Sequence, residues 1–506
     1  MASTANTADT RTRERARGLC LSREAVLLSS VVGGFAAFWA ACSILIHRSF
    51  HSNGWDLGLI NQVIWNTANG RPFEYSFRDM SYSGDHFQPV LYALVPLQWL
   101  GTGPEALLVV QALALAFAAV PLYLAVRKMA GVQAAWVLVV AYLLGLGVSR
   151  AVSFDFHFEA FAPLLTFGAL WCMVTGRSWG FVLCGLLILT LKEDAALLTL
   201  ALCWVAWLAF RERRAAAVLA GASMAYALLA NYVVVPHYRG DGLNPFLERY
   251  SYLGDSPAEA LLAVFLHPDR VVEQLARWDA LEAVLLVVAS SAFLPLLTPR
   301  LLPALGVVVL VPLLSLQADQ GSLSLHYFLV PSTLALVIGA VAVRDGIRSD
   351  EKLSVGRWQI EGARWPAGLA AMIVGLFLVA SPLPPSPFAD WDRFNVDSHA
   401  RLANSFVEEI PADATVSAQS PFVAHLSKRE DIYQFPRVLD ADYVLLDSKG
   451  QIPQTDLSGG YYDCLAALPR LGFDITRSED GITLWEKRRP SEQVPEAPLA
   501  CSGQHP

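Results

Sequence analysis

The chain has 506 residues, of which 54% are hydrophobic and only 16% are charged. Soluble globular proteins average about 25% charged residues, so water is not the main solvent of this chain, and an ordinary soluble fold is excluded. The formal net charge of -8 comes with no basic face, because the arginines occur in short clusters between apolar segments. Nucleic-acid binding is therefore not expected.

Apolar residues gather in blocks close to the roughly 20 residues that a helix needs to cross the hydrocarbon core of a membrane. The predicted fold class is therefore mainly α, a polytopic membrane protein of about 11 transmembrane helices. The first block is longer than the apolar core of a signal peptide, so we expect it to stay as an anchor. The predicted crossings are residues 25–47, 104–126, 131–149, 158–175, 180–191, 195–210, 214–236, 279–297, 301–317, 325–343 and 365–383.

The orientation follows from the excess of lysine and arginine in cytoplasmic loops. A cytoplasmic N-terminus places almost every basic cluster inside and the C-terminus outside. The stretch 88–101 is too short to cross and contains Pro89 and Pro96, so it is predicted to be interfacial or re-entrant. The stretch 180–210 is predicted to be two short helices that turn at Lys192–Asp194, because a single helix would place three charges in the hydrocarbon core.

The membrane domain is predicted to be flanked by polar regions on both sides. The expected parts are a cytoplasmic tail (1–24), a membrane domain (25–383) with external loops at 48–103 and 237–278, an extracytoplasmic α/β domain (384–488) and a disordered tail (489–506). The α/β prediction depends on short strand-like runs that alternate with helical patterns. These runs are Thr415–Ala418, Tyr443–Leu446 and Ile482–Trp485.

Two of the seven cysteines, Cys464 and Cys501, lie in the predicted external region. Oxidising conditions there would permit a disulfide between them. The other five lie in or beside apolar blocks, where cysteine usually acts as a small buried hydrophobe. The cysteines therefore suggest no metal site.

Unusual polar residues collect on the predicted outer side, beginning in the first loop. Asp56 opens an amphipathic helical pattern and is either its N-terminal cap or a general base. Asp85 either caps the helix at 88–101 or, with His86, takes part in substrate binding. Both positions are close to the predicted membrane surface.

A second group lies between two predicted crossings. Arg150 ends one crossing, and Asp155, His157 and Glu159 open the next, alternating with phenylalanines. Two carboxylates and an imidazole at the membrane edge predict a substrate or cation site. If a metal is needed, oxygen ligands favour magnesium or manganese, whereas the single imidazole leaves zinc open.

Lys192, Glu193 and Asp194 form a third group, and His326 with Tyr327 a fourth. Ionisable residues at membrane depth are functional candidates by default. The alternatives are a self-neutralising turn for the former and interfacial anchoring for the latter. The sequence contains no phosphate-loop motif, so a nucleotide-driven pump is disfavoured.

Taken together, these motifs resemble a family of bacterial and archaeal membrane proteins described as a domain of unknown function. The resemblance covers about residues 30 to 490 and depends on Trp55–Gly58, Gly84–Phe87, Phe154–Glu159, Lys192–Ala195 and His326–Tyr327. That family is in turn similar to the GT-C superfamily, membrane glycosyltransferases that take a sugar from a polyprenyl-phosphate carrier on the outer face. Unlike the protein mannosyltransferases, this chain has no second acid beside Asp56, so the acceptor (glycan, lipid or protein) and the metal dependence stay open.

The resemblance implies sugar transfer with Asp56 as catalytic base. The expected substrate-binding residues are Asp85, His86, Arg150, Lys192, Glu193, His326 and Tyr327, and the candidate metal ligands are Asp155, His157 and Glu159. Two other functions remain open: an ion-coupled transporter and a non-catalytic protein of envelope assembly. The one-sided distribution of charge disfavours the transporter, whose site usually lies at the bilayer midplane.

Overall fold

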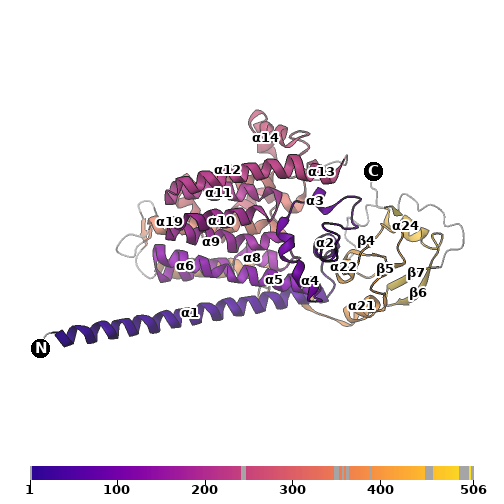
Figure 1. Cartoon of the computed structure of the whole chain (residues 1–506), viewed down its shortest axis with the longest axis horizontal. Helices are drawn as coiled ribbons and strands as arrows, with labels where there is room; N and C mark the ends of the chain where they lie inside the picture. The colour runs from indigo at the N-terminus through magenta and orange to yellow at the C-terminus, as the bar shows by residue number, and fades with distance from the viewer. Residues whose placement is uncertain are drawn as a thin grey trace.

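The computed structural model describes residues 3–240, 247–346, 353–355, 358–360, 364–387, 389–450, 460–488 and 501–502. Long helices lie side by side in a bundle, and a smaller α/β domain lies at one end of it (Figure 1). Helix α1 (Ser3–Arg48) runs along the bundle and ends near this domain. The predicted tail at 489–506 lies outside the described residues, except for Cys501 and Ser502.

Seven helical segments in the described part of the chain are long and apolar enough to cross a membrane. Helices satisfy their own backbone hydrogen bonds, which lipid cannot do for them. The chain is therefore a multi-pass membrane protein. The segments are Arg23–Arg48, Pro104–Ala130, Val132–Val152, Phe158–Thr175, Glu193–Phe210, Arg213–Arg239 and Ala318–Gly346.

These segments contain several shorter elements. They are α5 (Pro104–Phe117), α6 (Ala119–Ala130), α7 (Val132–Leu143), α8 (Leu146–Val152), η3 (Phe158–Phe161), α9 (Ala162–Thr175), η4 (Glu193–Ala195), α11 (Ala196–Val205), η5 (Ala206–Phe210), α12 (Arg213–Leu229), η6 (Ala230–Val234), α13 (Val235–Arg239), α18 (Ala318–Gly321), η10 (Leu325–Phe328) and α19 (Leu329–Gly346).

The other predicted crossings correspond to shorter helices, so the count of about eleven stays a prediction, as does the orientation of the termini. These helices are α10 (Ser178–Leu189), α16 (Trp278–Ser290), α17 (Leu302–Leu313) and α20 (Arg364–Ala380). Between α16 and α17 lie η8 (Leu294–Leu297) and η9 (Pro299–Leu301), and between α19 and α20 the strands β1 (Leu353–Val355) and β2 (Trp358–Ile360) pair antiparallel.

The stretch 180–210 is two helices, as predicted. Helix α10 ends at Leu189, α11 begins at Ala196, and Lys192 between them has an extended backbone with φ −169° and ψ 159°. A continuous helix would hold the charges of Lys192–Asp194 at mid-membrane. The break instead places them where loop residues can pair with them.

The first loop folds into short helices, none of them long enough to cross a membrane. They are η1 (Gly54–Gly58), α2 (Leu59–Ala68), α3 (Tyr82–Asp85), η2 (Pro89–Ala93) and α4 (Val95–Trp99). The second loop contains η7 (Glu248–Tyr250), α14 (Pro257–Leu266) and α15 (Pro268–Leu275). The stretch 88–101 contains only the short helices η2 and α4, and its interfacial position stays a prediction.

Both capping interpretations are wrong. Asn53 caps η1, because its Oδ1 accepts a hydrogen bond from the Trp55 N–H at 2.9 Å, and Asp56 lies inside the first turn. Asp85 ends α3 and bonds side chains of its own loop rather than capping the next helix. Asparagine directly before a glycine-led turn is itself a favoured cap, so the sequence contained this signal.

The C-terminal domain is a five-stranded sheet with helices, in the order β4-β3-β5-β7-β6. Strand β3 is parallel to β4 and β5, and β7 is antiparallel to β5 and β6. The elements are η11 (Trp391–Phe394), α21 (Ser398–Glu409), β3 (Val416–Ala418), α22 (Ser420–Leu426), β4 (Ile432–Gln434), β5 (Tyr443–Asp447), α24 (Tyr461–Ala467), β6 (Phe473–Glu479) and β7 (Ile482–Lys487). The three predicted strands are confirmed as β3, β5 and β7.

The first loop and the C-terminal domain share one apolar core. Leu57 and Ile64 of the loop belong to the same buried cluster as Phe422 and Val423 of α22. A Cβ added to Gly58 would lie 3.0 Å from Val423 Cγ1, so the glycine permits close approach of η1 to α22. Burial of this shared surface holds the domain on the bundle.

Gly84 makes a second close approach, which gives a prediction. A Cβ there would lie 2.7 Å from the Arg239 backbone nitrogen and 2.8 Å from the Tyr238 carbonyl oxygen. Backbone cannot yield as a side chain does, so Gly84→Ala is expected to destabilise the fold by about 1–3 kcal/mol. Thermal unfolding in detergent measures this. Gly221→Ala, with no atom within 4 Å of its added Cβ, is the control, and equal melting temperatures for both variants would contradict the prediction.

Candidate functional site

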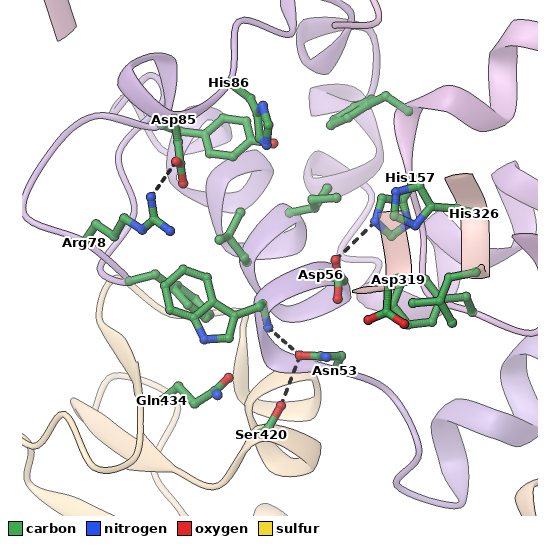
Figure 2. Close-up of a pocket in the computed structure, with 18 of the residues that line it drawn as sticks. Asn53, Asp56, Arg78, Asp85, His86, His157, Asp319, His326, Ser420 and Gln434 are labelled. Carbon is green, nitrogen blue, oxygen red and sulfur yellow. Dashed lines mark hydrogen bonds and ion pairs between the residues drawn. The ribbon is translucent and has the colours of Figure 1, made fainter. Parts of the chain in front are cut away.

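A cavity of about 870 Å³ lies where the loops of the bundle meet the C-terminal domain. Its walls come from the first loop, the turn before α9, the break between α10 and α11, the second loop, the segment 317–327 and the residues around β4. Segments far apart in the sequence therefore line one cavity. Figure 2 shows Asp56 between His157 on one side and residues of the C-terminal domain on the other.

Asp56 and His157 form a pair in this cavity. His157 Nε2 lies 3.1 Å from Asp56 Oδ1, and its Nδ1 lies 3.1 Å from the Asp155 backbone carbonyl oxygen (Figure 2). Both ring nitrogens thus face acceptors, which only the doubly protonated imidazolium satisfies. Burial lowers the pKa of His157, but the hydrogen bond and charge of Asp56 outweigh burial and leave the pKa raised.

The imidazole of His157 is also fixed by stacking. Its ring centroid lies 3.6 Å from that of His326 and 5.4 Å from that of Phe154. His326 Nδ1 is buried without a hydrogen-bond partner among the described residues, and so is Glu159 Oε2. Both residues line the cavity, but these two atoms have almost no accessible surface of their own.

Lys192 provides positive charge to the same cavity. Its Nζ donates a hydrogen bond to Glu159 Oε1 at 3.1 Å. Burial disfavours the charged form, but the carboxylate of Glu159 outweighs it, and the pKa of Lys192 lies well above its usual value. The next residue, Glu193, accepts hydrogen bonds from His86 Nδ1 at 2.8 Å and from the Phe87 backbone N–H at 3.0 Å.

The predicted site residues divide into two groups. Those that line the cavity are Asp56, Asp85, His86, His157, Glu159, Lys192, His326 and Tyr327. Asp85 is held there by Arg78 Nη1 at 2.8 Å and by the Tyr75 hydroxyl at 3.1 Å. Arg150, Asp155 and Glu193 are not among the lining residues, and Arg150 instead donates to the Leu323 carbonyl oxygen at 3.0 Å.

The three candidate metal ligands form hydrogen bonds with three different groups. The Asp155 carboxylate accepts the Asn53 backbone N–H at 2.6 Å, His157 bonds Asp56, and Glu159 bonds Lys192. Within the described ranges, no three His, Cys, Asp or Glu residues gather as a metal-binding group. The residues present therefore do not fit the metal centre that the sequence suggested.

Sequence reasoning missed several lining residues. They are Asn53, Arg78, Asp79, Arg249, Gln317, Asp319, Ser420, Gln434 and Arg437. Most of them lie in short turns or at strand ends, where hydrophobic periodicity gives no signal. Asn53 and Arg78 lie within a few residues of the motifs Trp55–Gly58 and Gly84–Phe87, and this proximity was the one indication in the sequence that they belong to the site.

Comparison with known proteins identifies the family. The family described as "Predicted membrane protein (DUF2079)" matches residues 46–460, which is most of the chain. The chain belongs to this family. No curated protein matches it in sequence.

Solved structures give weaker similarity. ArnT from Cupriavidus metallidurans bound to undecaprenyl phosphate is 12% identical, with a TM-score of 0.43, over 89% of this chain and 98% of ArnT. The apo state of ArnT is 13% identical, with a TM-score of 0.45, over 92% and 98% of the two chains. The Archaeoglobus fulgidus oligosaccharyltransferase in complex with Zn and sulfate is 14% identical, with a TM-score of 0.39, over 88% and 73%. Identities and TM-scores this low transfer no chemistry to this chain.

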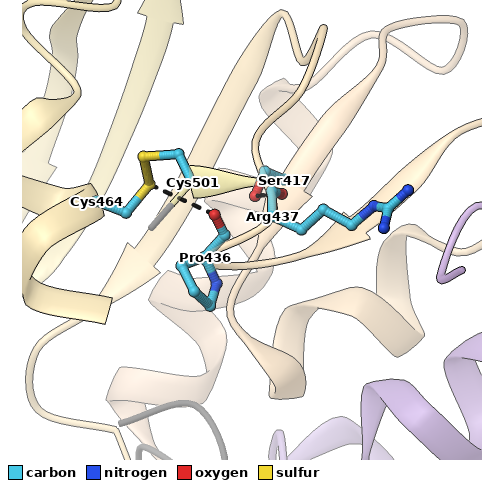
Figure 3. Close-up of a disulfide and its surroundings, with 5 residues drawn as sticks. All are labelled: Ser417, Pro436, Arg437, Cys464 and Cys501. Atoms are coloured by element: carbon cyan, nitrogen blue, oxygen red, sulfur yellow. Dashed lines mark hydrogen bonds between the residues drawn. A yellow bond between two sulfur atoms is a disulfide. The ribbon is translucent and has the colours of Figure 1, made fainter. Parts of the chain in front are cut away.

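A disulfide lies behind one wall of the cavity. Cys464 and Cys501 form a disulfide (Figure 3). The Val438 N–H donates a hydrogen bond to the Cys501 carbonyl oxygen at 3.0 Å. The Ser417 hydroxyl donates a hydrogen bond to the Arg437 carbonyl oxygen at 2.7 Å. The pairing that the sequence permitted thus forms beside Arg437, whose guanidinium pairs with Asp79 of the first loop.

The burial of Asp155 gives a pH prediction. Burial raises the pKa of this carboxyl from 3.8 to about 7, and the charge of Asp56 acts in the same direction. As pH rises from about 4 to about 7, the unfolded chain loses a proton that the folded chain keeps, so stability falls, and above pH 7 the loss is constant. Asparagine does not titrate, so Asp155→Asn should gain roughly 1–3 kcal/mol over wild type between about pH 5 and pH 8. Melting curves of the two proteins that stay parallel across this range would contradict it.

Proposed function

We propose that the protein is a membrane glycosyltransferase of the GT-C type, which transfers a sugar from a polyprenyl-phosphate-linked donor to an acceptor on the outer face of the membrane. The observation that carries the proposal is that Asp56, held by His157, lines the same cavity as Lys192. A base for the acceptor and a cation for the leaving phosphate are the two charges that such a reaction requires. The sequence resemblance to GT-C enzymes supports the same chemistry.

The reaction is inverting glycosyl transfer. The acceptor hydroxyl oxygen bonds to the anomeric carbon while the bond from that carbon to the phosphate oxygen breaks, and polyprenyl phosphate leaves with the bonding electrons. The hydroxyl proton passes to Asp56 Oδ2, because Oδ1 is engaged by His157. The charge that develops on the phosphate is stabilised by Lys192.

Two side chains of the cavity wall suit a polar substrate. Glu159 and His326 both line the cavity, and each has one buried polar atom without a partner among the described residues. A small side-chain shift that exposed either atom would let a sugar hydroxyl form a hydrogen bond with it.

The transporter alternative is less consistent with the position of the cavity. Carrier sites usually lie at the bilayer midplane between helices. This cavity instead lies at the end of the bundle, where residues of the C-terminal domain form part of its wall. Its location fits chemistry at the membrane surface better than passage across the membrane.

The sequence leaves open whether transfer depends on magnesium or manganese. Because the candidate ligands bond other groups, we expect transfer to keep at least about half its rate in excess chelator, with Lys192 supplying the charge that a metal would otherwise give. The measurement is the transfer rate before and after chelation. A loss of activity that magnesium or manganese restores would contradict this and return Asp155, His157 and Glu159 to consideration as ligands.

The function itself is tested with purified protein in lipid vesicles. A polyprenyl-phosphate hexose or pentose with a labelled sugar is supplied together with membrane extract as the source of acceptor. We expect label to move to an acceptor with inversion at the anomeric carbon and release of polyprenyl phosphate. If the donor stays intact after prolonged incubation and the label enters the same vesicles in an ion-dependent way, the result would support a transporter instead.

A further inference from the structure

One side of the cavity, formed by η1 and the C-terminal domain, differs from the side that contains Lys192. Trp55 lines it, and the indole is 38% exposed although its neighbours are mostly buried. The indole packs edge-on against Phe77, with the two ring centroids 5.2 Å apart. The Arg78 guanidinium carbon lies 5.2 Å from the centroid of the indole. A large aromatic side chain is thus held in a fixed orientation and left partly uncovered inside the cavity.

Uncharged polar side chains line the same part of the cavity. Asn53 Oδ1 accepts hydrogen bonds from the Trp55 N–H at 2.9 Å and from the Ser420 hydroxyl at 3.1 Å. Its amide nitrogen is the part that can donate to a ligand. Gln434, at the end of β4, adds a second amide on the same side (Figure 2).

The cations on this side are paired with carboxylates. Arg78 bonds Asp85 at 2.8 Å, and Arg437 bonds Asp79 across the interface between the first loop and the C-terminal domain. Paired charges attract a phosphate weakly but offer both donors and acceptors to hydroxyl groups. An aromatic surface with amides and balanced charges suits a neutral ring that has C–H groups on one face and hydroxyls at its edge.

We infer that Trp55, Asn53 and Gln434 form a subsite for a neutral, hydroxyl-rich sugar ring, which is the acceptor end of the substrate. The identification as acceptor depends on the proposed function, whereas the binding of carbohydrate does not. Because Gln434 and Ser420 belong to the C-terminal domain, that domain forms part of the subsite together with η1. Asp56, one residue after Trp55, then lies beside the ring whose hydroxyl it deprotonates.

The test is saturation-transfer NMR on the full-length protein in nanodiscs, with a panel of neutral disaccharides that includes maltose, cellobiose, lactose and mannobiose. We expect saturable transfer to the C–H protons of at least one sugar. Trp55→Ala should weaken binding about tenfold, and Trp55→Tyr, which keeps an aromatic face, should stay within about threefold of wild type. Trp99→Ala is the matched control, because Trp99 is an exposed tryptophan of the same loop that does not line the cavity.

Three outcomes would overturn the subsite: no sugar of the panel binds saturably, Trp55→Ala binds like wild type, or Trp99→Ala loses as much binding as Trp55→Ala. The melting temperature of each variant shows whether a loss of sugar binding comes from unfolding. If Trp55→Ala is unfolded, the subsite is judged from the binding of Trp55→Tyr, which should stay close to that of wild type. The two proposals fail separately. Sugar binding without transfer would reject the transferase, whereas transfer to an acceptor without sugar binding in this panel would reject the subsite.

Discussion

Sugar transfer is expected to fall by a factor of roughly 10² or more when Asp56 is replaced by asparagine. The amide keeps the size of the side chain and can still accept the His157 hydrogen bond, but it cannot take a proton from the acceptor. Binding of the donor should change little, because Asp56 acts on the acceptor hydroxyl. The measurement is single-turnover transfer of labelled sugar, together with the affinity for the donor.

Asp319→Asn is the matched control for this experiment. Asp319 also lines the cavity, and its Oδ1 accepts a hydrogen bond from the Ser324 hydroxyl at 3.0 Å, so the variant removes one carboxylate from the same space. A simple loss of negative charge would affect both variants equally. Wild-type turnover by Asp56→Asn would leave Asp56 as a structural partner of His157 and would reject it as the base.

The second large effect is expected at Lys192. Removing the ammonium takes away the charge that stabilises the departing phosphate, which should lower transfer by roughly 10²–10³. Lys192→Met alone would leave the carboxylate of Glu159 unpaired in a buried position and destabilise the fold. The informative variant is therefore Lys192→Met combined with Glu159→Gln, which removes both charges of the pair.

Two readouts separate catalysis from stability in this double variant. Its melting temperature should stay near that of wild type, while both transfer and polyprenyl phosphate binding fall. Glu159→Gln alone, which keeps the ammonium, should retain more activity than the double variant. Equal rates for these two proteins would show that Lys192 plays no part in stabilising the phosphate.

The helices of the membrane domain could be predicted because lipid imposes simple rules. Apolar length predicts a crossing, and the cost of mid-membrane charge predicts the break at Lys192. The same rules could not show that Glu159 would pair with Lys192 or that His86 would pair with Glu193. Those contacts depend on how separate helices pack, which a hydrophobic pattern does not encode.

The candidate site was predicted in part. Residues such as Asp56 and His157 stood out because ionisable groups close to a membrane are unusual. Their partners were not predictable, because Asp155 and His157 are only two residues apart and yet bond Asn53 and Asp56, respectively. Gln434 and Arg437 belong to a different domain, and no local signal in the sequence links them to the first loop.

The most direct measurement is an experimental structure of the protein with bound polyprenyl phosphate. We expect the phosphate inside the cavity, within hydrogen-bond distance of Lys192 Nζ, with the oxygen that carries the sugar directed toward Asp56. The prenyl chain would leave the cavity between helices toward the lipid. A phosphate bound outside this cavity, or inside it but away from both Lys192 and Asp56, would contradict the proposed function.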